Sequence, residues 1–193
     1  MNRYKGQGWY FESQRHSLAA KGIRTSFLKR IFKKGKFHST LSGPEVKALA
    51  SEVESKLKPL SKKIEVAGSI RRNVDEPVDI DIVMIPKDKQ KIRERLAELG
   101  KVTAQGETMI ETRIKGVDVD TYFTEPESYG AQLMTRTGPW QGNIGNRTLA
   151  KNKGMRLNQY GLWEKNKRIA GRTEKEIYEA LGKKYKEPEI RGL

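Results

Sequence analysis

The chain has 193 residues, with 39 Lys and Arg against 24 Asp and Glu, and a formal net charge of +15. This length fits one ordinary domain or two small ones and excludes a large multidomain enzyme. With no Cys and only His16 and His38, the sequence excludes disulfides and thiol chemistry and nearly excludes Cys- or His-based metal sites. No apolar run approaches the roughly 20 residues that cross a bilayer, and no apolar signal segment opens the chain, so we expect no membrane partner.

The charge is distributed unevenly along the chain. Residues 1–63 carry a balance of +11, residues 64–130 carry −4, and residues 131–193 carry +8. Two basic segments therefore flank an acidic middle, which predicts surfaces that bind phosphates beside a cluster of carboxylates with another task. Basic surfaces attract any nucleic acid, so the charge alone does not identify the partner.

Residues 1–40 are basic and contain scattered aromatic residues. Lys29, Arg30, Lys33 and Lys34 surround an apolar pair in this segment. The pattern is compatible with a basic arm whose aromatic rings stack on bases. It is equally compatible with a surface extension that contains one helical piece, and the sequence leaves both interpretations open.

The rest of the chain alternates helical and strand patterns. An apolar stripe at helical spacing begins near Gly43 and Pro44 and ends at Pro59. The patterns that follow predict strands at 64–67, 78–85 and 117–123, hairpins at 101–115 and 156–170, helices at 87–99, 127–136 and 139–153, and a last helix at Thr173, with a Thr173–Glu176 capping box. This order predicts an α/β (α+β) fold: a mixed sheet with helices, then a small C-terminal lobe.

Acidic residues alternate with apolar ones on two of the predicted strands. Residues two apart in a strand share a face, so Asp79 and Asp81 project together. Asp118 and Asp120 repeat the pattern on a later strand. Neighbouring carboxylates repel each other and are usually compensated by a divalent cation. If the two strands are neighbours, the carboxylates converge as a two-metal phosphoryl-transfer site requires.

If the pattern stood alone, an exposed polar face would be the favoured explanation of an Asp-x-Asp strand. Val83 and Ile85 continue the acid-bearing face, however, so that face is not simply solvated. Upstream, Gly68-Ser69 forms a turn that can offer N–H groups and a hydroxyl to a phosphate, with Arg72 close by. Together these residues favour a phosphoryl-transfer site.

These motifs resemble the nucleotidyltransferase signature of the family X DNA polymerases. The resemblance includes Gly68-Ser69-x-Arg71-Arg72 followed by Val78-Asp79-Ile80-Asp81, and it continues in order through 119–120, 126–131, 137–138, 157–161, 169–171 and 185–188. It covers about 64–193 and implies a nucleotidyltransferase palm at 45–130 and a thumb at 131–193, preceded by a basic extension at 1–44. The lyase, helix-hairpin-helix and phosphoesterase domains of other members have no room in this length.

The resemblance also implies roles for individual residues. Asp79 and Asp81 would bridge two Mg²⁺ ions, with Mn²⁺ as a possible substitute, and Asp120 would bind the catalytic ion and help the primer 3′-hydroxyl to lose its proton. Gly68, Ser69 and Arg72 would contact the phosphates of the nucleoside triphosphate. The distance along the chain to Thr137-Gly138 favours Asp120 as third ligand, and Asp118 is its rival.

Further positions correspond to contacts with the nucleotide and the template. Asn143 would touch the nucleotide and Arg147 the template, and a solvated polar face is the alternative for both. DNA would also be bound by basic residues at both ends of the chain: Lys29, Arg30, Lys33, Lys34, Lys151, Lys153 and Arg156. One departure is Thr135-Arg136, which stands where the family has an aromatic pair that lines the sugar pocket, so ribonucleotide incorporation is a hypothesis.

The sequence therefore predicts a template-directed DNA polymerase, acting in gap-filling repair on a primer-template or gapped duplex. A template-independent nucleotidyltransferase and a non-catalytic nucleic-acid-binding protein on the same fold are the alternatives. We expect a monomer, intracellular and either cytoplasmic or nucleoid-associated.

Overall fold

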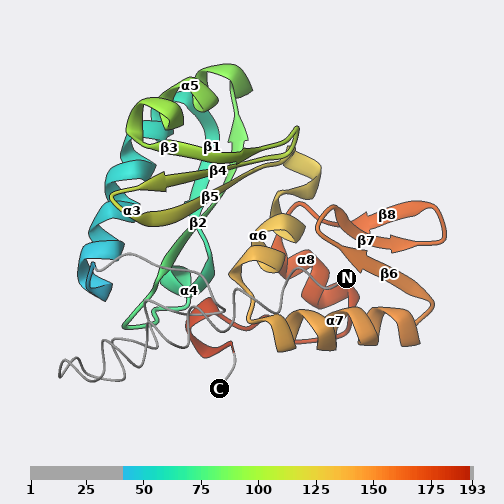
Figure 1. Ribbon diagram of the computed structural model, residues 1–193. Coiled ribbons are helices and arrows are strands. Elements are labelled where there is room, and N and C mark those ends of the chain that lie inside the picture. The colour runs from blue at the N-terminus through green and yellow to red at the C-terminus, as the bar shows by residue number, and fades with distance from the viewer. Residues whose placement is uncertain (1–40, 192–193) are drawn as a thin grey trace, which may run out of the picture.

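Two β-sheets follow one another along the chain in the computed structural model, which describes residues 41–191 (Figure 1). The strands of the first sheet are β1 (Ser61–Val66), β2 (Asp79–Pro86), β3 (Lys101–Gln105), β4 (Met109–Ile114) and β5 (Val117–Phe123). Those of the second are β6 (Met155–Asn158), β7 (Gly161–Glu164) and β8 (Lys167–Ala170). The helices are α3 (Gly43–Leu57), α4 (Gly68–Arg71), α5 (Lys89–Leu99), α6 (Tyr129–Thr137), α7 (Trp140–Asn152) and α8 (Glu174–Ala180), with short 3₁₀ turns at Lys58–Leu60, Pro126–Ser128 and Pro188–Ile190.

The first sheet is mixed, with strand order β1-β2-β5-β4-β3. Strands β2 and β5 run parallel at its centre, and every other neighbouring pair is antiparallel. The chain leaves β2, passes through α5 and the β3–β4 hairpin, and returns to place β5 beside β2. The predicted fold class, an α/β arrangement with a mixed sheet and helices, is confirmed.

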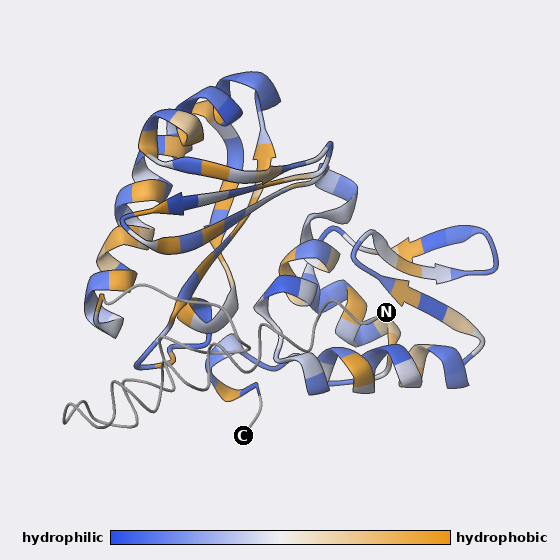
Figure 2. Ribbon diagram, viewed as in Figure 1, coloured by the Kyte–Doolittle hydropathy of each residue, from blue (hydrophilic) through white to orange (hydrophobic). Residues whose placement is uncertain are grey.

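Each face of this sheet packs against different helices. On one face, Ile80, Ile82 and Met84 of β2 are fully buried in a core that includes Leu49 of α3 and Leu96 of α5. Figure 2 shows hydrophobic residues along β2 and alternating hydrophobic and hydrophilic residues along α3 and α5, as expected for helices with one buried side. The burial of this face directs the intervening acids of β2 to the opposite one.

The opposite face packs against α6. Val83 of β2 is buried with Tyr129 and Leu133 of that helix, and Ile85 packs at the edge of the same cluster. The acid-bearing face is therefore partly covered, as the sequence predicted from Val83 and Ile85. Its acids lie where the covering helix ends.

Side-chain caps mark where the helices α3, α5 and α8 begin. Ser42 and Glu45 form a capping box at α3, with Pro44 in the first turn, and the Asp88 carboxylate accepts two backbone N–H bonds at the start of α5. At α8, Thr173 accepts from the Glu176 N–H, as predicted. The Glu176 carboxylate instead accepts from the N–H groups of residues 171 and 172, so only half of the predicted capping box is present.

Two local predictions were wrong. The segment predicted as one hairpin at 156–170 is a three-stranded antiparallel sheet, because two turns divide it: Gln159-Tyr160 joins β6 to β7, and Lys165-Asn166 joins β7 to β8. Gly68-Ser69, predicted as a turn, begins the short helix α4. None of the helices between residues 41 and 191 is both long and apolar enough to cross a membrane.

Candidate active site

The parallel pairing of β2 and β5 brings the predicted carboxylates together. Asp81 lies directly opposite Asp120, and Asp79 lies opposite Asp118. All four project from the face that packs on α6, because the alternate positions of both strands are buried on the other face. The sequence predicted this convergence on the condition that the two strands are neighbours, and they are.

Asp118 and Asp120 have different partners. The Arg113 guanidinium donates from Nε and from a terminal nitrogen to Asp118 Oδ1, at 2.8 and 2.7 Å. Asp120 Oδ2 accepts from the Tyr122 hydroxyl at 3.1 Å, and Glu111 of β4 lies directly opposite Asp120. Asp118 is thus neutralised within the sheet, whereas Asp120 remains among other acids.

Crowding and burial act strongly on these carboxyls. Burial, followed by the Asp79 and Asp120 charges, raises the pKa of Asp81 to about 7, although two arginines oppose the change. Burial also raises the pKa of Asp120, with Glu111 adding to the effect and the Tyr122 hydrogen bond opposing it. The chain therefore holds negative charge here against an electrostatic cost.

Gly68 lies against Asp81 in a conformation that favours glycine. Its φ is +63°, and a Cβ atom at this position would lie 2.2 Å from Asp81 Oδ2. The backbone is fixed at this point, because the Ala67 N–H donates to the Asp81 carbonyl at 2.7 Å. Next to it, the buried Ser69 hydroxyl has no hydrogen-bond partner. At this point of the site the backbone therefore approaches the Asp81 carboxylate closely, and the neighbouring hydroxyl is unused.

Replacing Gly68 with alanine is expected to lower the free energy of unfolding by about 1–3 kcal/mol, because the backbone conformation becomes strained. The new methyl group also displaces the Asp81 carboxylate. Any activity that depends on Asp81 should therefore fall even under conditions in which the variant is fully folded. Urea unfolding checks the first effect. Gly145→Ala is the control, since it lies in helix α7 with nothing within 4 Å of a Cβ and is expected to stabilise.

The donor set suits a divalent cation. Within residues 41–191, no three or more His, Cys, Asp or Glu side chains are gathered tightly enough to hold a metal ion. Mutual repulsion of the carboxylates explains this spacing: without a cation between them, Asp79, Asp81 and Asp120 stay apart. Their oxygens are the ligands that Mg²⁺ prefers. The charge of this cluster and the unpartnered Ser69 hydroxyl fit a bound cation with a phosphate beside it.

Arg72 and Asn143 line a cleft of about 560 Å³ beside Gly138. Arg72 donates to the Thr137 carbonyl, and the Asn143 amide donates to the Thr135 carbonyl at 2.8 Å. Arg147 is exposed on α7 and does not line this cleft. The structure therefore brings Arg72 and Asn143 together and leaves Arg147 apart.

The predicted DNA-binding residues fall into two groups. Lys29, Arg30, Lys33 and Lys34 lie outside the described residues. Lys151, Lys153 and Arg156 are exposed near the second sheet. The guanidinium of Arg156 lies 5.7 Å from the centre of the Trp163 ring, and Arg168 lies on the same ring at 5.5 Å.

Comparison with known proteins assigns the family. Over 156 residues the chain is 31% identical to the repair DNA polymerase X of African swine fever virus, with 74% of this chain and 90% of the viral protein aligned. The chain belongs to family X of the DNA polymerases. It is also 29% identical over 153 residues to the DNA polymerase/3′-5′ exonuclease PolX of Bacillus subtilis, where the alignment covers 74% of this chain and 27% of the relative. It thus spans about a quarter of that bacterial protein.

Two further matches agree with membership of family X. The family described as DNA polymerase beta thumb matches residues 132–192. The crystal structure of Leishmania infantum polymerase beta in a ternary P/T complex superposes with a TM-score of 0.70 at 21% identity, covering 95% of this chain and 88% of that one. At this identity the likeness shows the fold alone.

Two residues near the carboxylates of this family X chain, Glu111 and Tyr122, were not predicted from the sequence, and a third, Arg136, was noted only as a departure at the sugar pocket. Glu111 lies opposite Asp120, Tyr122 donates to it, and Arg136 lies over the Tyr122 ring at 3.7 Å. The alternation of Met109, Glu111 and Arg113 with buried residues could have placed Glu111 on the acid face. No sequence signal pairs Tyr122 with Arg136, because the two are on elements that meet only in the folded chain.

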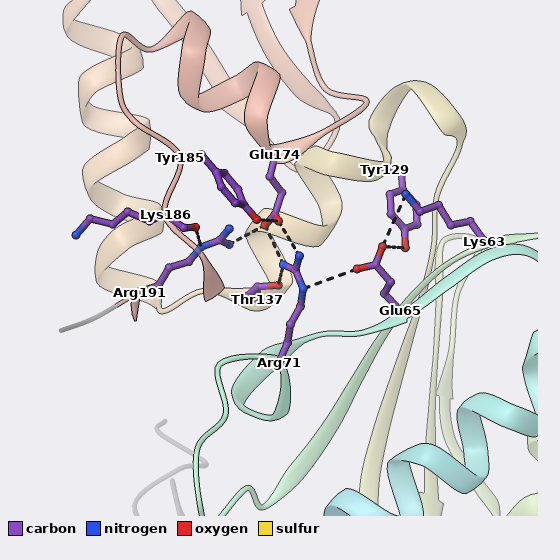
Figure 3. Close-up of polar contacts among 9 residues, drawn as sticks. All are labelled: Lys63, Glu65, Arg71, Tyr129, Thr137, Glu174, Tyr185, Lys186 and Arg191. Carbon is purple, nitrogen blue, oxygen red and sulfur yellow. Dashed lines mark hydrogen bonds and ion pairs between the residues drawn. The ribbon is translucent and has the colours of Figure 1, made fainter. Parts of the chain in front are cut away.

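A buried ionic network joins the two parts of the molecule (Figure 3). Glu174 of α8 accepts from both terminal nitrogens of Arg71 of α4, at 3.1 and 2.8 Å, and from Arg191 at 2.6 Å. Arg71 also donates to the Thr137 hydroxyl. Since Arg71 and Arg72 are consecutive, the network fixes the end of the predicted phosphate-binding segment, Gly68–Arg72, relative to the second sheet.

Proposed function

We propose that this chain is a template-directed DNA polymerase that adds a nucleotide to a primer 3′-hydroxyl during gap-filling repair. The observation that carries the proposal is the direct pairing of Asp81 with Asp120 on parallel strands, with Gly68 against Asp81. The family X repair polymerases to which the chain is similar support the same reaction class.

In the proposed reaction the chain contributes positioned charges and no covalent intermediate. Asp79, Asp81 and Asp120 would hold Mg²⁺ ions, or Mn²⁺ in their place, in keeping with the general use of divalent metals by family X. When bound, the ions would neutralise the carboxylates and the phosphates and lower the pKa of the primer 3′-hydroxyl. Asp120 would orient that hydroxyl and help it to lose its proton.

On the nucleotide side, the free Ser69 hydroxyl and the backbone at Gly68 would contact the triphosphate. Arg72 would add a charge-assisted contact. Asn143 lines the same cleft as Arg72, so it is placed to touch the nucleotide once its bond to the Thr135 carbonyl is exchanged. Arg147 would contact the template strand from the exposed side of α7.

The proposal includes the domain division: a palm at 45–130, a thumb at 131–193 and a basic extension at 1–44. Lys151, Lys153 and Arg156, exposed on the thumb side, would contribute to DNA binding. Their charges would act mainly on affinity and on its salt dependence. Monomeric action and the hypothesis of ribonucleotide incorporation remain part of the proposal.

Primer extension on a one-nucleotide-gapped duplex, with Mg²⁺ and each nucleotide alone, tests the function. We expect insertion of the complementary nucleotide and a loss of about 10²–10³-fold in Asp120→Asn, as for other groups that stabilise transition-state charge. The matched control is Asp118→Asn, which removes a carboxylate already paired with Arg113 and should cost less than about tenfold.

Other results would replace the proposal. Addition regardless of the template base would indicate a template-independent nucleotidyltransferase. DNA binding without turnover, strengthened by Asp120→Asn, would indicate a binding protein on this fold, because unneutralised carboxylates repel DNA.

A further inference from the structure

Three side chains form a continuous contact from helix α6 to a predicted catalytic carboxylate. The Arg136 guanidinium of α6 lies over the Tyr122 ring, 3.7 Å from its centre. The Tyr122 hydroxyl in turn donates to Asp120 Oδ2 at 3.1 Å. Because the Tyr122 side chain is 6% exposed and bounded by α6 and β4, its ring has little freedom to leave this position.

The guanidinium of Arg136 has unused hydrogen-bond donors. It makes no hydrogen bond or ion pair with any described residue, and its Nε is buried without a partner. A guanidinium carries five N–H groups, and a buried N–H without a partner is costly. Stacking on Tyr122 uses the face of the group and leaves its edge free. Such an arrangement is suited to an anion that binds in the plane of the guanidinium.

A cleft of about 390 Å³ lies next to this pair. Tyr122 and Arg136 line this cleft on the side of the first sheet. Arg168 of β8 and Tyr160 line it on the side of the second sheet, and Lys89 also contributes to its wall. Three cationic side chains thus share one cleft, with Glu107 and Glu125 as the acids that line it. The cleft extends from the neighbourhood of Asp120 to the second sheet, so an elongated polyanion fits it better than a small ion does.

We propose that Arg136 binds a backbone phosphate of the nucleic-acid strand whose 3′ end reacts, and that Tyr122 positions Asp120 beneath it. This inference rests on the proposed function. Arg136 is the choice for the strand rather than for the free nucleotide because the Ser69 and Arg72 groups that suit a triphosphate are absent from its cleft. The planar guanidinium of an arginine can also donate two parallel hydrogen bonds to the oxygens of a phosphodiester, whereas the ammonium group of a lysine cannot.

The coupling follows from the contacts. A phosphate held by Arg136 fixes the guanidinium, the guanidinium holds the Tyr122 ring, and the ring fixes the Asp120 oxygen to which it donates. The bound strand thus lies beside a carboxylate that Tyr122 already holds in place for the 3′-hydroxyl. The arginine that stands where the family has an aromatic residue thus acquires a role that no aromatic ring could perform.

The first test measures binding of a 5′-labelled primer-template by fluorescence anisotropy in EDTA, at several salt concentrations, with the full chain. Arg136→Met should weaken binding about 5- to 20-fold and reduce the slope of log K against log salt by about one. Arg136→Lys should be intermediate, because it keeps the charge without the planar guanidinium. The control is Arg95→Met, which removes an equal charge from an exposed i,i+3 pair with Glu98 on α5 and should leave affinity within twofold.

The second test concerns Tyr122→Phe, which keeps the ring under Arg136 and removes the hydroxyl. DNA affinity in EDTA should be unchanged. Mn²⁺ affinity, measured by titration calorimetry without DNA, should fall about tenfold, as is usual when the group that orients a ligand is lost. In extension assays kcat should fall about tenfold while KM for the nucleotide stays constant. Because an unfolded fraction would also lower the apparent kcat without changing KM, urea unfolding of Tyr122→Phe must show that the variant is fully folded under the assay conditions.

Several outcomes overturn the inference. If Arg136→Met binds DNA as tightly as Arg95→Met does, Arg136 does not bind a phosphate of the strand. A raised nucleotide KM with unchanged DNA affinity reassigns Arg136 to the triphosphate. Unchanged Mn²⁺ affinity in Tyr122→Phe removes the positioning role. If the wild type extends no primer yet Arg136→Met still loses DNA affinity and slope, the phosphate contact stands and the proposed function fails.

Discussion

Glu174→Gln is expected to lower the free energy of unfolding by about 3–5 kcal/mol. The carboxylate is 5% exposed and lies between two guanidinium groups, those of Arg71 and Arg191, of which Arg191 is 4% exposed (Figure 3). Removing its charge leaves the buried Arg191 without a counter-charge among the described residues and leaves Arg71 only its longer contact with Glu65, at 3.8 Å. Loss of one partner is the costly way to break a buried pair. Urea unfolding at pH 7, monitored by tryptophan fluorescence, measures the change.

The matched control is Glu52→Gln. Glu52 also contacts two cations, Lys56 and Lys115, but all three side chains are exposed, so this substitution should leave the free energy of unfolding nearly unchanged. Equal effects of the two substitutions would show that burial of the Glu174 network contributes nothing. A selective loss at Glu174 would show that the two sheets are held together by this ionic contact.

The same network predicts a dependence on pH. Burial by itself would raise the pKa of Glu174, but hydrogen bonds from Arg71 and Arg191 outweigh it and lower the pKa below its ordinary value. A carboxyl with a lowered folded-state pKa contributes stability that is fully present above its unfolded pKa of about 4.3, and that is lost as the pH falls through the folded value. The stability difference between wild type and Glu174→Gln should therefore shrink as the pH is lowered below about 4.

The parts of the site that could be predicted from the sequence are those that a local pattern of residues specifies. The alternation of acids with apolar residues on β2 and β5 fixes which face Asp79, Asp81 and Asp120 share, and the helix patterns fix which face is buried. A single further condition, that the strands pair, completed the cluster. That condition was met because the β3–β4 hairpin and α5 return the chain to β2.

Other features depend on contacts between distant segments and carry no local pattern. Glu174 and Arg71 are 103 positions apart, and no pattern in either segment predicts that the two side chains pair. Tyr122 and Arg136 meet only because α6 packs on the acid face of the sheet. The second sheet was mistaken for a hairpin because its strands are only four residues long, too short for a period-2 pattern to separate them.

Asp81→Asn is expected to raise the free energy of unfolding in EDTA at pH 8 by about 1–2 kcal/mol while abolishing nucleotide addition. The ionised carboxyl is held in a partly buried place beside Asp79 and Asp120, and its raised pKa of about 7 records the cost of that charge. An amide of the same shape removes the cost. Such opposite effects on stability and activity are typical of residues kept for catalysis.

A matched acid separates this effect from a general response to lost charge. Asp75→Asn changes an exposed carboxylate and should alter stability by less than about 0.5 kcal/mol. Added Mg²⁺ should stabilise the wild type and narrow its difference from Asp81→Asn, because a ligand that binds only the folded state raises its stability by mass action. Lower stability of Asp81→Asn in EDTA would instead mean that favourable contacts hold the ionised group, and the electrostatic argument for a bound cation at these strands would fail.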